Sequence, residues 1–292
     1  DAMSGSRDAG SLLGGLEWVE VANPEVRLGA VRHAVFDFDG TLSVIRRGWE
    51  QVMIPLMLEM ICDGHPAPAG LETEVADYVD RSTGILTIKQ MMWLESAVRR
   101  YGLAAQPLTA RAYKQIYNER LLGPVRRRLT QLNGSQEARD ALAVAGACSF
   151  VQALRDRGVV LYLASGTDHV YVVEEAQALG VASYFEGRIY GAMDDTEAYS
   201  KERIIARILA DHGLEGEALL VVGDGPVEIR HARDHGAVAL GVAVDEDRRQ
   251  GLNPRKRERL LAAGADLIVT DFLHYGALAA ALCGATVGAQ LD

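Results

Sequence analysis

Residues 31–41 read Val-Arg-His-Ala-Val-Phe-Asp-Phe-Asp-Gly-Thr, a largely apolar run that ends in two aspartates and a glycine. A short run rich in β-forming residues, bounded by glycine and polar residues, is typical of a buried strand that leads into a loop. Asp37 and Asp39 stand two residues apart, so on an extended backbone both side chains would point to the same side. We therefore expect a strand over residues 31–38 with a pair of carboxylates at its carboxyl end.

The stretch from Trp49 to about Ala147 has a different pattern. Its apolar residues recur at helical spacing, and almost nothing alternates with period two. Proline and glycine cluster at residues 65–70 and at residues 123–124, where turns are expected. The pattern predicts several helices that are separated by turns.

Beyond this stretch, helical and strand patterns alternate, and glycine follows most of the helical segments. Expected helices span residues 150–157, 170–179, 201–212, 227–235 and 253–263. Expected strands span residues 159–164, 184–190, 218–222, 237–242 and 266–269. Short apolar strands that alternate with helices predict an α/β fold with a doubly wound parallel sheet.

The helical stretch interrupts this sheet after its first strand, so the α/β core is discontinuous in sequence. We expect the core to comprise residues 31–45 and 145–275, and the helical segment to comprise residues 46–144. Residues 1–30 are expected to form an irregular lead-in, and residues 276–292 a tail without an assigned role.

Composition excludes several classes of protein. The chain has 292 residues, 49% of them hydrophobic, and a formal net charge of −10, which argues against a nucleic-acid-binding protein. The three cysteines are widely spaced and suggest neither a disulfide framework nor a zinc cluster. No apolar stretch approaches the roughly 20 residues that cross a bilayer, and no signal peptide is recognisable. We expect a soluble cytoplasmic protein with no membrane or nucleic-acid partner and an unknown oligomeric state.

Three of the expected strands end in residues that can carry chemistry, and in such sheets ligands bind at the carboxyl ends of strands. The first strand leads to Asp37 and Asp39, and the second to Ser165-Gly166-Thr167. The strand over residues 218–222 leads to Gly223-Asp224-Gly225, with Glu228 shortly after. These strand ends are therefore expected to meet at one site.

The residue types at these strand ends favour phosphoryl transfer. Carboxylates from two strands suit a hard divalent cation, above all Mg²⁺. The hydroxyl of Ser165, the backbone amides after it and Lys201 suit a phosphoryl group. Lys201 is the only lysine between residues 115 and 255. One aspartate can attack phosphorus, and a second can act as acid and then base.

In this order, the motifs resemble those of the haloacid dehalogenase superfamily of phosphohydrolases. The four motifs are residues 37–41, residues 165–167, Lys201, and residues 223–225 with Glu228. The resemblance implies a Rossmann-like core and a helical cap inserted between the first and second motifs. It also implies that Asp37 is the nucleophile and Asp39 the general acid and base.

The same resemblance implies a ligand set. Mg²⁺ would be held by Asp37, the backbone carbonyl of Asp39, and Asp224, with Glu228 as a ligand or just behind the ligands. The phosphoryl group would be held by residues of the first three motifs, namely Thr41, Ser165, Gly166 and Lys201. Members of the superfamily often have aspartate at the position of Glu228, so the sequence departs from the pattern there. Asp39 points to phosphatases and phosphomutases, because related dehalogenases and cation-pumping ATPases differ at this position.

We interpret the chain as an enzyme, a Mg²⁺-dependent phosphoric monoester hydrolase that acts on a small phosphorylated metabolite. Sugar phosphates and phosphorylated acids are the leading substrate classes. A phosphomutase would use the same core, and the sequence separates the two poorly. A catalytically silent phosphometabolite-binding protein is a further alternative, although such a protein would have no need to retain Asp39.

Several other polar residues have both a functional and a structural interpretation. Arg46 and Arg47 could bind a second phosphate or a carboxylate of the substrate, or be ordinary surface arginines. Residues 83–87 are expected to be a plain helix start, and Asp168 to cap a helix. Residues 255–257 are expected to be a solvated helix face.

Overall fold

The computed structural model describes residues 7–132, 134–193 and 200–284. Within them the main sheet has seven strands in the order β2-β9-β8-β7-β4-β5-β6. Every neighbouring pair is parallel except β2 with β9. The doubly wound, mainly parallel sheet is therefore confirmed. Its strands are β2 (Val19–Val21), β4 (His33–Phe36), β5 (Val160–Asp168), β6 (Ile189–Ala192), β7 (Leu219–Gly223), β8 (Val238–Val242) and β9 (Leu267–Val269).

Helices cover both faces of the sheet, which explains why its strands are continuously apolar. In β4, Ala34 and Phe36 face one hydrophobic cluster and Val35 faces the other. Phe36 contacts the rings of Phe150 and Phe185 on its side. The first face is covered by α7 (Ala147–Arg155), α8 (His169–Leu179) and α12 (Tyr275–Cys283), and the second by α9 (Lys201–His212), α10 (Pro226–Asp234) and α11 (Pro254–Ala263).

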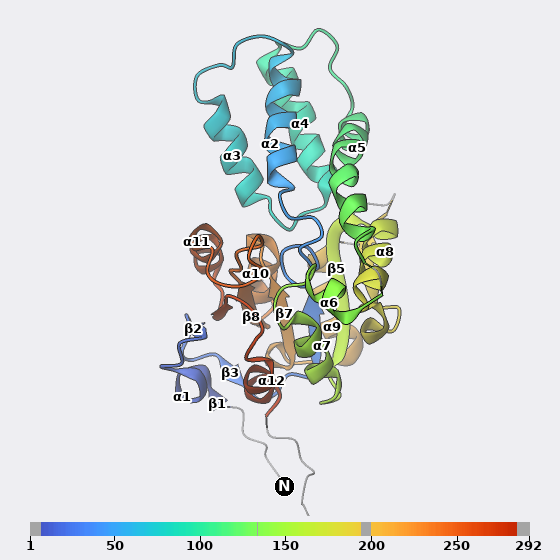
Figure 1. The fold of residues 1–292 in the computed structure, drawn as a ribbon. Helices are drawn as coiled ribbons and strands as arrows, with labels where there is room; N and C mark the ends of the chain where they lie inside the picture. The colour runs from blue at the N-terminus through green and yellow to red at the C-terminus, as the bar shows by residue number, and fades with distance from the viewer. Residues whose placement is uncertain (1–6, 133, 194–199, 285–292) are drawn as a thin grey trace, which may run out of the picture.

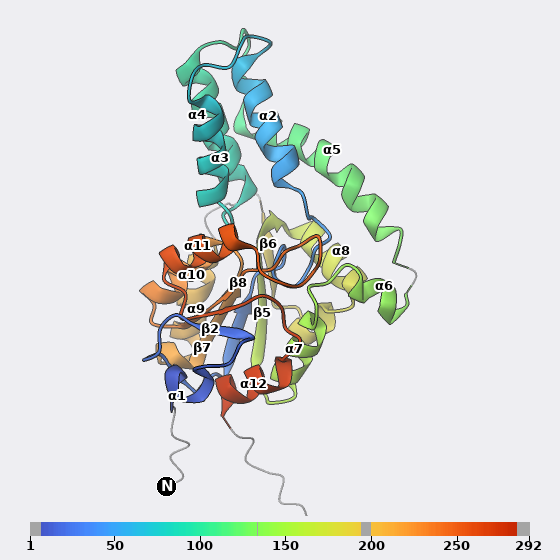
Figure 2. The same ribbon diagram turned by 60° about the vertical axis from the view of Figure 1, so that its left-hand side comes forward.

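Four helices between β4 and β5 form a separate bundle, which we call the helical insertion. Figure 1 shows the bundle standing over one end of the sheet. The shorter helix α6 (Gln136–Asp140) follows and lies lower, beside α8 (Figure 2). None of the described helices is long and apolar enough to cross a membrane. The insertion comprises α2 (Glu50–Cys62), α3 (Leu71–Arg81), α4 (Thr87–Tyr101) and α5 (Ala110–Leu129).

The expected irregular lead-in over residues 1–30 is wrong for its described part, residues 7–30. This part contains β1 (Arg7–Asp8), α1 (Ala9–Leu13) and β3 (Arg27–Leu28), and it supplies the edge strand β2. These elements have two to five residues each, which is too short for a periodic pattern to stand out.

Two further expectations need correction, one for the strand over residues 184–190 and one for the tail over residues 276–292. The segment expected as a strand over residues 184–190 begins in a 3₁₀ turn, η1 (Ala182–Phe185), and strand β6 starts only at Ile189. The tail was given no role, yet α12 buries Leu278, Ala279 and Leu282 against the core, and residues 285–292 lie outside the described part. Its many alanines hid this helix, since they give little amphipathic contrast.

Replacing Leu282 with alanine tests the structural role of α12. Leu282 is 0% exposed, so Leu282→Ala should lower the free energy of unfolding by about 2–5 kcal/mol through lost burial and a cavity. Leu273→Ala is the control, because Leu273 lies just before α12 and is 56% exposed. Urea denaturation measures both variants. Equal stability of the two variants would contradict the packing of α12.

Candidate active site

Three strand ends meet at the carboxyl end of the sheet, beneath the helical insertion. Strand β4 lies between β5 and β7, so the residues that follow these strands are neighbours. The backbone N–H of Asp37 donates to the carbonyl of Val222 at 2.9 Å, which continues the β4–β7 pairing up to the carboxylate. Asp224 follows directly after β7, and Ser165 lies within β5. The motifs predicted to meet are therefore brought together.

Lys201 is buried beside the carboxylate of Asp37. Its Nζ lies 3.0 Å from Asp37 Oδ1 and 3.2 Å from Glu228 Oε2. Lys201 is the first residue of α9, and the Oγ of the preceding Ser200 accepts from the N–H of Arg203 and fixes the helix start. The expected proximity of Lys201 to the aspartates is thus present in the structure.

Lys201 and Asp37 shift each other's pKa toward the charged forms, against the effect of burial. Burial lowers the pKa of Lys201, but Asp37 and Glu228 raise it above its usual range, so the ammonium group stays protonated. Burial raises the pKa of Asp37 well above its usual range, and Lys201 lowers it in part. Lys201 therefore helps Asp37 to remain a carboxylate, the form that can attack or bind a cation.

Three carboxylates form a cluster that fits a divalent cation. Oxygens of Asp37, Asp224 and Glu228 lie within 4.8 Å of one another, and all three residues are buried. Glu228 is held in place because its Oε1 accepts from the backbone N–H of Gly225 at 2.9 Å, at the start of α10. Hard oxygen donors are the ligands that Mg²⁺ prefers. These residues fit Mg²⁺.

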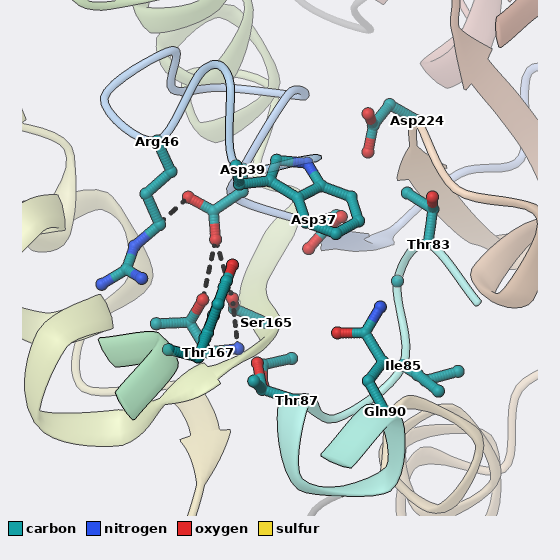
Figure 3. Close-up of a pocket in the computed structure, with 14 residues that line it drawn as sticks. Asp37, Asp39, Arg46, Thr83, Ile85, Thr87, Gln90, Ser165, Thr167 and Asp224 are labelled. Carbon is teal, nitrogen blue, oxygen red and sulfur yellow. Dashed lines mark hydrogen bonds and ion pairs between the residues drawn. The ribbon is translucent and has the colours of Figure 1, made fainter. Parts of the chain in front are cut away.

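Asp39 turns away from this cluster, toward the residues that end β5 (Figure 3). Its Oδ2 accepts from Thr167 Oγ1 at 3.0 Å and from Ser165 Oγ at 3.4 Å. Its Oδ1 is buried and has no hydrogen-bond partner in the described part of the chain. Burial raises the pKa of Asp39, and Arg46 lowers it in part. A carboxyl group with a raised pKa and a free oxygen can carry a proton to or from a ligand.

The two arginines that follow the first motif lie in different places. Arg46 is buried, lines the pocket and forms an ion pair with Glu175, with Nη2 at 2.6 Å from Oε1. Its Nε also lies 3.9 Å from Asp39 Oδ1. Arg47 does not line the pocket; it points to Asp247, with a closest N–O distance of 3.9 Å. The structure therefore brings only Arg46 to the site.

Two further residues predicted for the phosphate site differ in position: Gly166 is half-buried and lines the pocket, whereas Thr41 does not line it. Thr41 is fully buried, and its Oγ1 has no hydrogen-bond partner among the described residues. Gly166 leaves no room for a side chain, because a Cβ there would collide with the backbone carbonyl of Ile85. A glycine is needed at this position because the backbone of the insertion approaches so closely.

The pocket at this site lies between the core and the helical insertion. The expectation that residues 83–87 are merely a helix start is wrong, because most of them line the pocket. Sequence reasoning missed further pocket residues, since no local pattern shows which face of an insertion meets the core. The insertion and the segment leading to it contribute Trp49, Thr83, Gly84, Ile85, Thr87, Gln90 and Tyr117.

Lys256 is a second buried lysine at the site, where a solvated helix face was expected. Its Nζ lies 2.7 Å from Asp224 Oδ2 and 2.6 Å from Glu246 Oε1. The segment also begins with Asn253 as helix cap, which places Lys256 in the first turn of α11. The charge run looked solvated because the partners of Lys256 are distant in sequence or lie in a loop. Asp168 is the N-cap residue of α8, as expected, but its carboxylate makes no capping bond and instead accepts from Lys114 and Asn118 of α5.

Comparisons of the sequence identify a family and one curated relative. A family model described as haloacid dehalogenase-like hydrolase matches residues 31–236. A 5'-nucleotidase of Pseudomonas aeruginosa is 31% identical over 97 residues, which are 33% of this chain and 43% of that protein. The match thus spans less than half the length of the curated relative.

Solved structures share the fold across most of the chain. A conserved haloacid dehalogenase-like protein of unknown function from Agrobacterium tumefaciens is 20% identical, with a TM-score of 0.54, and covers 86% of this chain and 98% of that one. A predicted phosphatase from Clostridium acetobutylicum is 16% identical, with a TM-score of 0.53, and covers 84% and 96%. A HAD family hydrolase from Deinococcus radiodurans, solved with bound phosphate and sodium, is 15% identical, with a TM-score of 0.51, over 86% and 96%.

Replacing Gly84 with alanine tests the close approach of the insertion. Gly84 has φ +94°, and a Cβ there would collide with the carboxylate of Glu228, which Lys201 and Gly225 hold in place. Gly84→Ala should therefore displace the loop and speed hydrogen exchange of the amides of residues 82–87 by about tenfold or more. Gly102→Ala is the matched control, because Gly102 also has a positive φ, of +63°, but nothing within 4 Å of its Cβ position. Unchanged exchange in Gly84→Ala would refute the contact.

Proposed function

This chain belongs to the haloacid dehalogenase-like hydrolase family, and from that premise we propose that it is a Mg²⁺-dependent phosphatase of a small phosphorylated metabolite. The observation that carries the proposal is the buried carboxylate of Asp37, which lies 3.0 Å from Lys201 and in one cluster with Asp224 and Glu228. A nucleophile, a cation site and an ammonium group at one place are the parts that phosphoryl transfer requires.

The proposed reaction begins with attack of an Asp37 oxygen on phosphorus. The bond to the leaving oxygen breaks, and Asp39 donates its proton to that oxygen, giving an aspartyl phosphate and the free alcohol. The raised pKa of Asp39 supports this role as an acid. Asp39 then takes a proton from water, which attacks the phosphorus and releases phosphate from Asp37.

The remaining residues hold the transferring group. Lys201 and Ser165 would bind its oxygens, and the backbone amides after Ser165 would add further donors. Mg²⁺, held by Asp37, Asp224, the backbone carbonyl of Asp39 and Glu228, would offset the repulsion between carboxylate and phosphate. The helical insertion would act as a cap that excludes water and orients the leaving group.

The pocket supports a small substrate. Its volume is about 70 Å³, where one water molecule needs about 10–15 Å³. The insertion presents the neutral polar side chains of Thr83, Thr87 and Gln90 to it, together with aromatic rings. Arg46, which could bind a second anionic group, is already paired with Glu175. Of the two substrate classes, these groups favour a sugar phosphate over a phosphorylated acid.

A screen of phosphorylated metabolites with Mg²⁺ tests the proposal and its alternatives. Sugar phosphates and phosphorylated acids of three to six carbons are incubated with the protein, and free phosphate and isomerised product are both measured. Free phosphate is expected. An isomerised sugar phosphate without phosphate release would identify a phosphomutase, and binding without turnover would identify a sensor.

Replacing Asp37 with asparagine should lower phosphate release by at least about 1,000-fold, because the amide cannot form the covalent intermediate. Asp77→Asn is the control, since Asp77 is an exposed aspartate of α3 outside the pocket. Initial rates of phosphate release measure both variants. A wild-type rate for Asp37→Asn would rule out the mechanism.

Metal removal gives a second test of the proposed site. A chelator should abolish turnover, and added Mg²⁺ should restore it. Asp224→Asn should raise the Mg²⁺ concentration for half-maximal turnover by about tenfold or more, because a buried oxygen ligand loses its charge. Turnover that survives the chelator unchanged would exclude a metal-dependent phosphatase.

A further inference from the structure

Arg259, in the middle of α11, binds the loop that carries Asp224. Its Nη2 and Nε donate to the backbone carbonyl of Asp224 at 3.1 and 3.3 Å. Nη2 also lies 3.6 Å from the carboxylate oxygen Oδ2 of Asp224. The side chain of Arg259 is only 8% exposed. A buried arginine thus fixes the backbone from which a proposed metal ligand projects.

The other end of the same guanidinium group binds the helical insertion. Its Nη1 donates to Asp80 Oδ1 at 3.1 Å and to Thr83 Oγ1 at 3.4 Å. Asp80 lies near the end of α3, and Thr83 lines the pocket in the loop that follows. One side chain therefore bridges the insertion and the Asp224 loop.

The neighbouring cations of α11 do not make this bridge. Lys256, three residues earlier, holds the carboxylate of Asp224 and Glu246, and neither belongs to the insertion. Arg255 pairs with Asp80 at 3.2 Å, but its side chain is 63% exposed and it does not join Asp80 to the Asp224 loop within the described residues. The planar fork of Arg259 suits the bridge, because it offers separated nitrogens in a fixed geometry.

A contact between the insertion and the core on the other side of the pocket avoids Asp224. Lys114 and Asn118 of α5 donate to Asp168 at the end of β5. That contact can hold the insertion against the core without touching the carboxylate cluster. The bridge through Arg259 differs, because it joins the position of the insertion to the position of a residue in that cluster.

We propose that Arg259 is a positioning residue that couples docking of the helical insertion to the placement of Asp224 for Mg²⁺ binding. The inference rests on the proposed function, which assigns Mg²⁺ to Asp224. Coupling is reciprocal: if Mg²⁺ favours the docked insertion through Arg259, the docked insertion favours Mg²⁺ to the same extent. A change in the insertion, far from the proposed ligands, must then alter Mg²⁺ affinity.

The test compares Arg259→Lys, Asp80→Asn and the control Arg255→Lys, each in the full chain. Lysine at position 259 keeps a positive charge but offers a single nitrogen, so it cannot reach both sides of the bridge at once. Mg²⁺ affinity is measured by calorimetry, and docking by hydrogen exchange of residues 71–86 with and without Mg²⁺. Melting temperatures confirm that each variant is folded.

In the wild type and in Arg255→Lys, Mg²⁺ should slow exchange of residues 71–86, and the two affinities should agree within about twofold. In Arg259→Lys, Mg²⁺ should still bind but should no longer slow this exchange. Asp80→Asn should weaken Mg²⁺ binding by at least about fivefold, the lower end of typical coupling. Combining Asp80→Asn with Arg259→Lys should weaken Mg²⁺ binding little more than the stronger single change does, because both changes weaken the same bridge.

Two results would overturn the inference. One is Mg²⁺-dependent protection that persists in Arg259→Lys; the other is wild-type Mg²⁺ affinity in Asp80→Asn. The second remains decisive if Arg259→Lys does not fold. Asp224→Asn separates this failure from failure of the proposed function. If Asp224→Asn binds Mg²⁺ as tightly as the wild type, the metal site itself is misassigned. If Asp224→Asn loses Mg²⁺ binding while Asp80→Asn keeps the wild-type affinity, the metal site stands and the coupling is wrong.

Discussion

Burial of several carboxylates at one sheet edge is the constraint on which this structure depends. Asp37, Asp224 and Glu228 are all buried within one small cluster, and an isolated buried charge costs far more than folding can supply. The chain meets this cost with buried cations: Lys201 beside Asp37 and Glu228, and Lys256 beside Asp224. Lys201 lies on α9 and Lys256 on α11, so pairing these lysines with the carboxylates also constrains how the two helices dock.

The same constraint leaves negative charge at the site that the proposed cation would neutralise. The buried cations offset only part of the negative charge, because each is shared: Lys201 between Asp37 and Glu228, Lys256 between Asp224 and Glu246, and Arg259 between Asp224 and Asp80. A complete set of protein counter-ions would leave nothing for a metal ion to neutralise. The remaining negative charge, together with the raised pKa of Asp37, is what bound Mg²⁺ would relieve.

Much of the core could be predicted because its signals are local. The run over residues 31–41 and the expected limits of α9 follow from apolar runs, caps and glycines near each other in sequence. Burial of Lys256 could not be predicted, because its partner Asp224 is 32 positions away and the helix pattern is the same for an exposed lysine. The role of Gly84 was hidden for the same reason, since only the folded chain brings it to Glu228.

The close approach of Gly84 and Gly166 argues that the helical insertion belongs to the site and is not an appendage. At both positions a Cβ would strike the opposite part of the chain: Glu228 of the core in one case and Ile85 of the insertion in the other. Contacts this tight from both sides leave little freedom for the insertion to sit differently while docked. Specificity would then reside in the few insertion side chains that reach past these glycines, and a change in substrate preference could arise there without altering Asp37 or its cation partners.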